Sequence, residues 1–328
     1  MKSIVLAIAV LTASVVHAAP TEIVLTGERI FPESLTSTRD GTVVVGSMGG
    51  KGIFRAKPGA ATAEPWIAPG TEGSQAILGV LADDRTGTLW ACSGMSLTDG
   101  APAPQSALYA FDLKTGAHQA HYPLPTAGAL CNDIAIAADG ALYVADSTNM
   151  EVARLAKGGV ALETWAGHGA FGDKSGIVDG IAILGAKGSE RVFVNTYMGG
   201  KLYAVPIEKD GKAGTAAEIK LPRDLMRPDG MRASGKSALI LAESGGTGRV
   251  SLVTIKGAEG TLSVIDRDFP DGVPAVTMVG KTLYALEGQL PKRREPADAV
   301  KLNPFRVVAV PRGSVGMSGA PFVRHPTD

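Results

Sequence analysis

Acidic and amide side chains recur at one position of a repeated pattern in this sequence. Each stands at the polar entry to a short apolar run, which is followed by a glycine-containing turn and a second apolar run. The entry residues of the six copies are Glu33, Gly79, Asn132, Asp179, Asp229 and Asp271. If the copies fold alike, the five polar side chains converge, and such oxygen ligands suit a hard cation such as Ca²⁺ or Mg²⁺.

Crowding these carboxylates together has an electrostatic cost that itself indicates a cation. Two carboxylates about 5 Å apart repel by about 3 kcal/mol at an effective dielectric constant of about 20. Glu33, Asp179 and Asp229 would form three such pairs, so protons or a cation must offset the repulsion. We therefore predict one divalent cation, Ca²⁺ first, with Mg²⁺, Mn²⁺ and Zn²⁺ as alternatives. For any single copy the alternative interpretation is a simple turn, because Asp and Asn before glycine favour turns.

The spacing of the copies predicts the fold that must position these residues. The entry positions follow one another at intervals of 42 to 53 residues, and the apolar runs are short, rich in Val, Ile and Leu, and broken by glycine. A strand-only repeat of this length is typical of propeller blades. We predict an all-β, six-bladed β-propeller with four-stranded blades. A strand within residues 21–27 is expected to pair with one within residues 305–310 and close the ring.

The N-terminus has the features of a secretory signal peptide. Lys2 precedes an almost wholly apolar stretch over residues 4–16, and Val16-His17-Ala18 has the form of a cleavage site. We expect a signal peptide over residues 1–18, a single propeller domain over residues 19–328, and export to the periplasm or the extracellular space. The two cysteines, Cys92 and Cys131, could pair in an oxidising compartment or remain buried free thiols.

The overall charge indicates which partners to expect. The 32 basic and 32 acidic residues balance to a formal net charge of zero. This balance offers no electrostatic reason to bind nucleic acid or an anionic membrane. We expect a small-molecule substrate and neither of those partners, while the oligomeric state stays open.

At the entry residues the sequence resembles the senescence-marker-protein, gluconolactonase and regucalcin-like family of six-bladed propellers. The matching motifs are "FPESL" at Glu33, "LCNDIA" at Asn132, "VDGIA" at Asp179 and "RPDGM" at Asp229. The resemblance implies that Glu33, Asp179 and Asp229 bind a divalent metal ion, that Asn132 binds this ion or contributes to its water shell, and that Asp229 is also the general base. Two departures stand out: Asp179 replaces the usual Asn, and Leu130 replaces an Arg of the sugar-lactone members. The first should tighten cation binding, and the second favours a less hydrophilic substrate.

Two functional hypotheses follow from the entry residues and the resemblance. The first is a metal-dependent hydrolase of a lactone or related ester, in which the metal acts as Lewis acid and Asp229 as general base. Tyr197 and Asp271 are the candidate substrate contacts. The second is an exported propeller without enzymatic activity that binds a ligand or protein, with a structural cation.

Overall fold

The computed structural model describes residues 19–95, 105–172 and 176–311. These residues form an all-β structure, as predicted, with two short 3₁₀ helices, η1 (Thr71–Gly73) and η2 (Leu290–Arg294). The signal peptide predicted over residues 1–18 lies outside the described residues. Among the residues that are described, no helix has the length and apolar character needed to cross a membrane.

Four sheets contain four strands each, and in each of them the spatial order follows the chain. The first sheet is β6 (Ala76–Asp83), β7 (Thr88–Met95), β8 (Ala107–Asp112) and β9 (His118–Pro123). The second is β10 (Cys131–Ile136), β11 (Leu142–Asp146), β12 (Glu151–Leu155) and β13 (Glu163–Ala166). The third is β14 (Val178–Leu184), β15 (Arg191–Thr196), β16 (Leu202–Pro206) and β17 (Ala217–Glu218). The fourth is β18 (Pro228–Ser234), β19 (Ala238–Glu243), β20 (Gly248–Lys256) and β21 (Glu259–Phe269).

A fifth sheet has eight strands and joins the two ends of the described chain. Its order is β2-β3-β4-β5-β1-β24-β23-β22. The strands are β1 (Glu22–Leu25), β2 (Pro32–Ser37), β3 (Val43–Ser47), β4 (Ile53–Ala56), β5 (Thr62–Ile67), β22 (Val276–Val279), β23 (Thr282–Glu287) and β24 (Arg306–Ala309). β1 runs antiparallel to β24, with Glu22 opposite Val308, and parallel to β5, with Val24 opposite Thr62.

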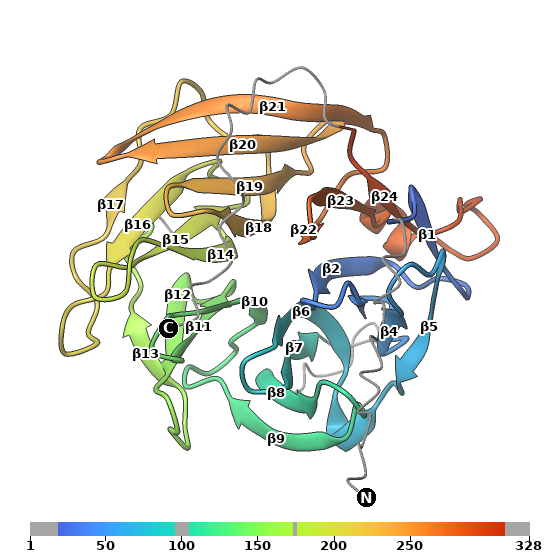
Figure 1. Cartoon of the computed structure of the whole chain (residues 1–328), viewed down its shortest axis with the longest axis horizontal. Helices are drawn as coiled ribbons and strands as arrows, with labels where there is room; N and C mark the ends of the chain where they lie inside the picture. Colours follow the sequence, from blue (N-terminus) through green and yellow to red (C-terminus); the bar gives the residue numbers. More distant parts are fainter. Residues whose placement is uncertain (1–18, 96–104, 173–175, 312–328) are drawn as a thin grey trace, which may run out of the picture.

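The sheets are arranged around a central axis (Figure 1). β2, β6, β10, β14, β18 and β22 lie nearest the middle of the view, and the later strands of each group lie progressively further out. Neighbouring inner strands are in contact: β10, for example, contacts both β6 and β14. An inner strand therefore presents its first residues to the axis, close to the equivalent residues of its neighbours.

The hydrophobic core lies between neighbouring sheets. In β11, Tyr143 and Ala145 pack in a cluster with residues of β14 and β15, whereas Leu142 and Val144 pack in a different cluster with Cys92 and Leu108. Successive residues of a strand point to opposite faces of the sheet, and here both faces are covered. This explains why the inner runs of the sequence are almost continuously apolar.

Candidate metal centre

Three acidic side chains from three different sheets meet near the axis. Glu33 lies in β2, Asp179 in β14 and Asp229 in β18. One carboxylate oxygen from each lies within 4.8 Å of the others. All three residues are buried, with exposed fractions of 7, 8 and 5% respectively. They are three of the four predicted ligands, and together we call them the acidic triad.

A β-bulge positions each member of the acidic triad. The strand register shifts across Glu33 where β2 pairs with β3, across Asp179 where β14 pairs with β15, and across Asp229 where β18 pairs with β19. β10 has the same shift across Asn132 and Asp133. A bulge bends the strand and re-aims the side chain of the extra residue. The sequence repeat is thus also a repeat of bulges, which turn polar side chains toward the axis.

A left-handed backbone conformation precedes each of these carboxylates. Phe31, Ile177 and Arg227 have φ values of 42°, 56° and 49°, and each lies two residues before a member of the acidic triad. This conformation costs a residue other than glycine roughly 1–3 kcal/mol, and β-branched Ile177 is an especially unfavourable case. The backbone carbonyl of each of these residues accepts a hydrogen bond from a backbone N–H in the loop after the second strand of its sheet. The donors are Met48, Tyr197 and Ser244, at 3.0, 2.8 and 2.9 Å respectively.

The glycine after Asp179 permits a close approach of two inner strands. A Cβ added at Gly180 would lie 2.3 Å from the carbonyl oxygen of Asp229 and 2.7 Å from Nδ2 of Asn195. That Asn195 amide donates to the Asp229 carbonyl at 2.7 Å, and the backbone N–H of Gly180 donates to Oδ1 of Asn195 at 3.1 Å. The "DG" pair here is therefore a packing requirement between neighbouring sheets and not a turn.

Burial and mutual repulsion raise the pKa values of the acidic triad. The pKa of Glu33 is raised well above its usual value, first by burial and then by Asp229, Asp179 and Asp133. The pKa of Asp179 is also raised well above its usual value, first by burial and then by Asp229 and Asp133. Burial raises the pKa of Asp229 to about 7, although hydrogen bonds from Ser244 and Gly230 oppose the rise. A divalent cation would remove this penalty by neutralising the ionised carboxylates.

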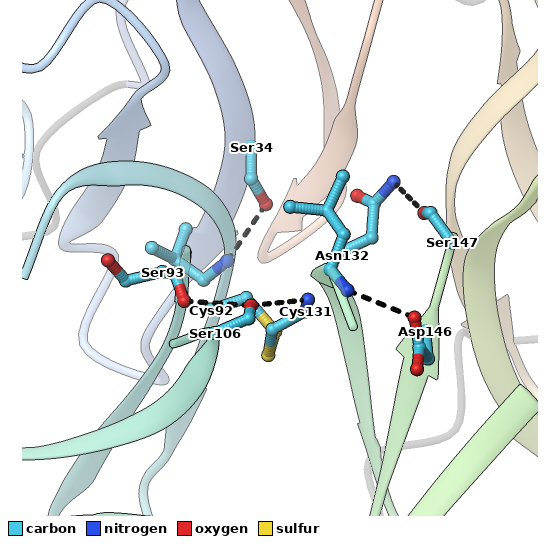
Figure 2. Close-up of a disulfide and its surroundings, with 10 residues drawn as sticks. Ser34, Cys92, Ser93, Ser106, Cys131, Asn132, Asp146 and Ser147 are labelled. Carbon is cyan, nitrogen blue, oxygen red and sulfur yellow. Dashed lines mark hydrogen bonds between the residues drawn. A yellow bond between two sulfur atoms is a disulfide. The ribbon is translucent and has the colours of Figure 1, made fainter. Parts of the chain in front are cut away.

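Asn132, the fourth predicted ligand, lies beside the acidic triad. It is buried, and its Nδ2 donates to Oγ of Ser147 at 2.8 Å (Figure 2). A side-chain hydrogen bond from Asn132 also lowers the pKa of Asp179, which places the amide against this carboxylate. The carboxylate oxygens of the acidic triad are the hard donors that Ca²⁺ and Mg²⁺ prefer. The residues present therefore fit a hard divalent cation.

The two predicted substrate contacts have different surroundings. Tyr197 is half-buried, and burial, followed by Asp229 and Asp179, raises the pKa of its phenol, although Arg227, whose guanidinium lies 5.9 Å from the ring centroid, opposes the rise. Asp271 does not belong to the acidic triad. Its carboxylate forms an ion pair with Lys292 at 2.7 Å.

A buried ion pair beside the acidic triad was not anticipated from the sequence. Nη1 of Arg232 donates to both carboxylate oxygens of Asp133, at 3.2 and 3.0 Å, while Nη2 donates to the carbonyls of Leu35 and Val80. The guanidinium thereby links inner strands β18, β10, β2 and β6, and its charge lowers the pKa of Glu33. The one sequence feature that could have indicated this ion pair is the charged Arg232 itself, in an inner strand three residues after Asp229.

Arg232→Met is expected to destabilise the protein by about 3–5 kcal/mol, because it leaves the carboxylate of Asp133 buried without its partner. The double variant Asp133→Asn with Arg232→Met should recover most of that loss, since no unpaired charge remains. Denaturant unfolding of the parent, both single variants and the double variant measures the coupling. A double variant no more stable than Arg232→Met would show that the pair is not the cause.

A disulfide holds the sheet of β7 to the sheet of β10, next to Asn132 (Figure 2). Cys92 and Cys131 are bonded, with a Cα–Cα distance of 5.0 Å and a sequence separation of 39. The backbone N–H of Cys131 also donates to Oγ of Ser106 at 2.8 Å. In the chain-entropy view, closing a loop of this length stabilises the fold by about 4 kcal/mol. The sequence left the pairing open, because it held no information on the distance between the two side chains.

A wide surface depression of about 670 Å³ lies away from the acidic triad. Residues of the β2–β3, β6–β7 and β8–β9 turns line it, among them Arg39, Asp84 and Lys114. These turns lie at the ends of the inner strands opposite the bulges, and both basic and acidic side chains line the depression. It shares no residue with the candidate metal centre.

The comparisons with known proteins establish the fold. No family model matches the sequence, and no curated protein sequence does so either. A gluconolactonase from Xanthomonas campestris has a similar structure, with a TM-score of 0.59 and 15% identity over 85% of this chain and 86% of that one. The calcium-binding protein regucalcin from Agrobacterium tumefaciens gives a TM-score of 0.59 and 14% identity, over 88% and 96% of the two chains. The chain has the gluconolactonase- and regucalcin-type propeller fold.

Other enzymes share this propeller fold as well. Virginiamycin B lyase from Staphylococcus aureus matches with a TM-score of 0.55 and 15% identity, over 88% of this chain and 97% of that one. A lyase and a gluconolactonase on the same propeller show that the fold alone does not determine the reaction. The chemistry of this propeller follows from the acidic triad and the side chains around it.

Proposed function

We propose that this protein is a divalent-cation-dependent hydrolase of a lactone or a related ester. The observation that carries the proposal is the meeting of Glu33, Asp179 and Asp229, whose oxygens lie within 4.8 Å of one another in a buried place. Three acids from three sheets have no structural need to be adjacent there, and their raised pKa values favour a cation. Two structures of the same fold, titled as a gluconolactonase and as a calcium-binding regucalcin, support this choice.

The residues around the centre have separate roles in this proposal. Glu33, Asn132, Asp179 and Asp229 would hold the cation, for which Ca²⁺ is our first choice. When bound, the cation supplies Lewis acidity toward a substrate carbonyl oxygen. Asp229 takes the proton of the attacking water as the general base. Ser244 Oγ and the backbone N–H of Gly230 each donate to this carboxylate at 3.0 Å and fix its orientation.

A substrate panel tests the proposal directly. The protein is incubated with aryl esters and with γ- and δ-lactones, first with a chelator and then with Ca²⁺, Mg²⁺ or Mn²⁺ in excess. We expect hydrolysis of at least one class with a cation and loss of that activity with the chelator. If no substrate is hydrolysed with any cation, the alternative gains, namely a propeller that binds a ligand or protein around a structural ion.

We also propose a blade count and a location for the chain. If the eight-stranded sheet is counted as β2–β5 plus a blade of β22, β23, β24 and β1, the propeller has six blades and the N-terminal strand closes the ring. The disulfide supports export, because such bonds persist in oxidising compartments. Mass spectrometry of the mature protein should find its N-terminus near residue 19, and an intact N-terminus would contradict export by the predicted signal peptide.

A further inference from the structure

We propose that an apolar surface next to the acidic triad binds the hydrocarbon part of the substrate. This surface consists of Ile177, Met198 and Met226 together with the ring of Tyr197, and we call it the apolar rim. The inference rests on the proposed function and narrows it to esters or lactones that carry an alkyl or aryl group, in place of polyhydroxylated sugar lactones.

Exposed large apolar side chains are rare in this structure and gather here. Among the described residues four stand out, Val160, Ile177, Met198 and Met226, with exposed fractions of 92, 37, 56 and 40%. Val160 lies in the β12–β13 turn, at the strand ends opposite the bulges. The other three belong to the apolar rim. Apolar groups concentrated on one face of a soluble protein are a common mark of a binding site.

Backbone hydrogen bonds make the apolar rim continuous. Tyr197 donates to the carbonyl of Ile177 at 2.8 Å, and Met198 donates to that of Gly176 at 2.9 Å. The next connection runs from Leu225, which donates to the carbonyl of Gly200 at 2.8 Å. These bonds tie the loop before β14, the loop after β15 and the loop before β18 side by side. Neighbouring sheets therefore contribute to one surface.

The apolar rim begins where the acidic triad ends. Ile177 lies two residues before Asp179 and Met226 three residues before Asp229. The backbone N–H of Tyr197 donates to the carbonyl of Ile177, so Tyr197 also lies at the entry to β14. On the other side of Asp179, Leu130 adds a half-buried apolar side chain two residues before Asn132. A carbonyl group held at the triad would therefore place its substituent against apolar side chains.

A buried carboxylate anchors the backbone of Met226, one of the two methionines of the apolar rim. The backbone N–H of Met226 donates to Oε2 of the buried Glu243 at 2.7 Å. Arg223 and Ser251 hold that carboxylate, with distances of 2.7 and 2.9 Å from Arg223 and 2.6 Å from Ser251. Nη2 of Arg249 donates to Sδ of Met226 at 3.2 Å. An anchored backbone that carries a polarisable thioether suits apolar groups of variable shape.

The test compares substrates and ligands of increasing alkyl length. For p-nitrophenyl butyrate and octanoate, the parent protein should give a kcat/KM at least roughly tenfold higher for octanoate, because one fully buried methylene is worth up to about fourfold. Met198→Gln and Met226→Gln should each lower this ratio, and the double variant should lower it by at least about fivefold. Val160→Gln removes an even more exposed apolar side chain from the opposite face and should leave the ratio unchanged.

Calorimetric titration of butyrate and octanoate into the Ca²⁺-loaded protein separates this inference from the proposed function. Tighter binding of octanoate that disappears in the double variant supports the apolar rim even if no ester or lactone is hydrolysed, in which case only the proposed function fails. Equal binding of the two acids by the parent overturns the inference. The inference is also overturned if the methionine variants retain in full the preference of the parent for the longer chain, in rate or in binding.

Discussion

Asp229→Asn is expected to lower kcat/KM for the hydrolysed substrate by roughly 10²- to 10⁴-fold, the usual contribution of a general base. The amide keeps the shape of the side chain but cannot accept the proton of water. The neutral side chain also weakens cation binding, so the rates must be compared at saturating cation, with the dissociation constant measured separately by calorimetry. The loss should persist at saturation, because it concerns proton transfer and not occupancy.

Asp271→Asn is the matched control for this variant. Both positions carry the tripeptide Pro-Asp-Gly, yet only Asp229 belongs to the acidic triad, while Asp271 pairs with Lys292. Although Asp271 was a candidate substrate contact, its carboxylate pairs with Lys292 outside the acidic triad, so we expect the Asp271 variant to keep its kcat/KM within about twofold. Full activity of Asp229→Asn at saturating cation would remove Asp229 from the role of general base.

The two Pro-Asp-Gly segments also show how far the sequence could predict the site. After Asp229 the chain continues as inner strand β18, so the aspartate enters a bulge. After Asp271, Gly272 has φ 82° and donates to the carbonyl of Phe269, which makes the segment a turn. Pro274 follows and lacks the N–H that a strand ladder uses. The carbonyl of Pro274 accepts a hydrogen bond from the backbone N–H of Gly230 at 2.8 Å. This carbonyl packs closely against Gly230, just as the carbonyl of Asp229 packs closely against Gly180.

The position of a residue in the sequence repeat therefore predicted the site correctly where an inner strand, a bulge and a carboxylate occur together. Glu33, Asp179 and Asp229 were predicted to converge, and the structure brings them together. The prediction could not extend to the Asp133–Arg232 pair, because its partners come from different sheets and their contact depends on how the inner strands twist around the axis. For the same reason the sequence could not distinguish bonded from free cysteines.

Cation binding is expected to change the pH dependence of stability. Asp229 has a pKa of about 7 in the folded protein and the pKa values of Glu33 and Asp179 are also raised, so the folded state binds more protons than the unfolded state between about pH 4 and 7. Stability without cation should therefore fall as the pH rises through this window. For Asp229 alone the loss amounts to roughly 4 kcal/mol, at about 1.4 kcal/mol for each unit of pKa.

Carboxylates with lowered pKa values do not mask this effect. Hydrogen bonds from Arg223 and Ser251 outweigh burial and lower the pKa of Glu243, so its contribution is present above its unfolded pKa and is lost only in acid. Between pH 5 and 8 that contribution stays nearly constant. A fall in the melting temperature over this range would then come from the acidic triad.

Thermal unfolding with and without Ca²⁺, at pH 5 and pH 8, measures this prediction. With chelator the melting temperature should be lower at pH 8 than at pH 5. Saturating Ca²⁺ should raise it at pH 8 by on the order of 5–10 °C, since ligand at 1,000 times its dissociation constant adds about 4 kcal/mol. The rise should be much smaller at pH 5, where protons compete for the same oxygens. Asp112→Asn, at the end of β8 among the residues that line the depression, should leave both trends intact. When buried carboxylates with raised pKa values ionise at pH 8, they either lower the stability of the protein or bind a counter-ion. A melting temperature that rises with pH in chelator and does not change with Ca²⁺ would therefore mean that the acidic triad is not a cation site.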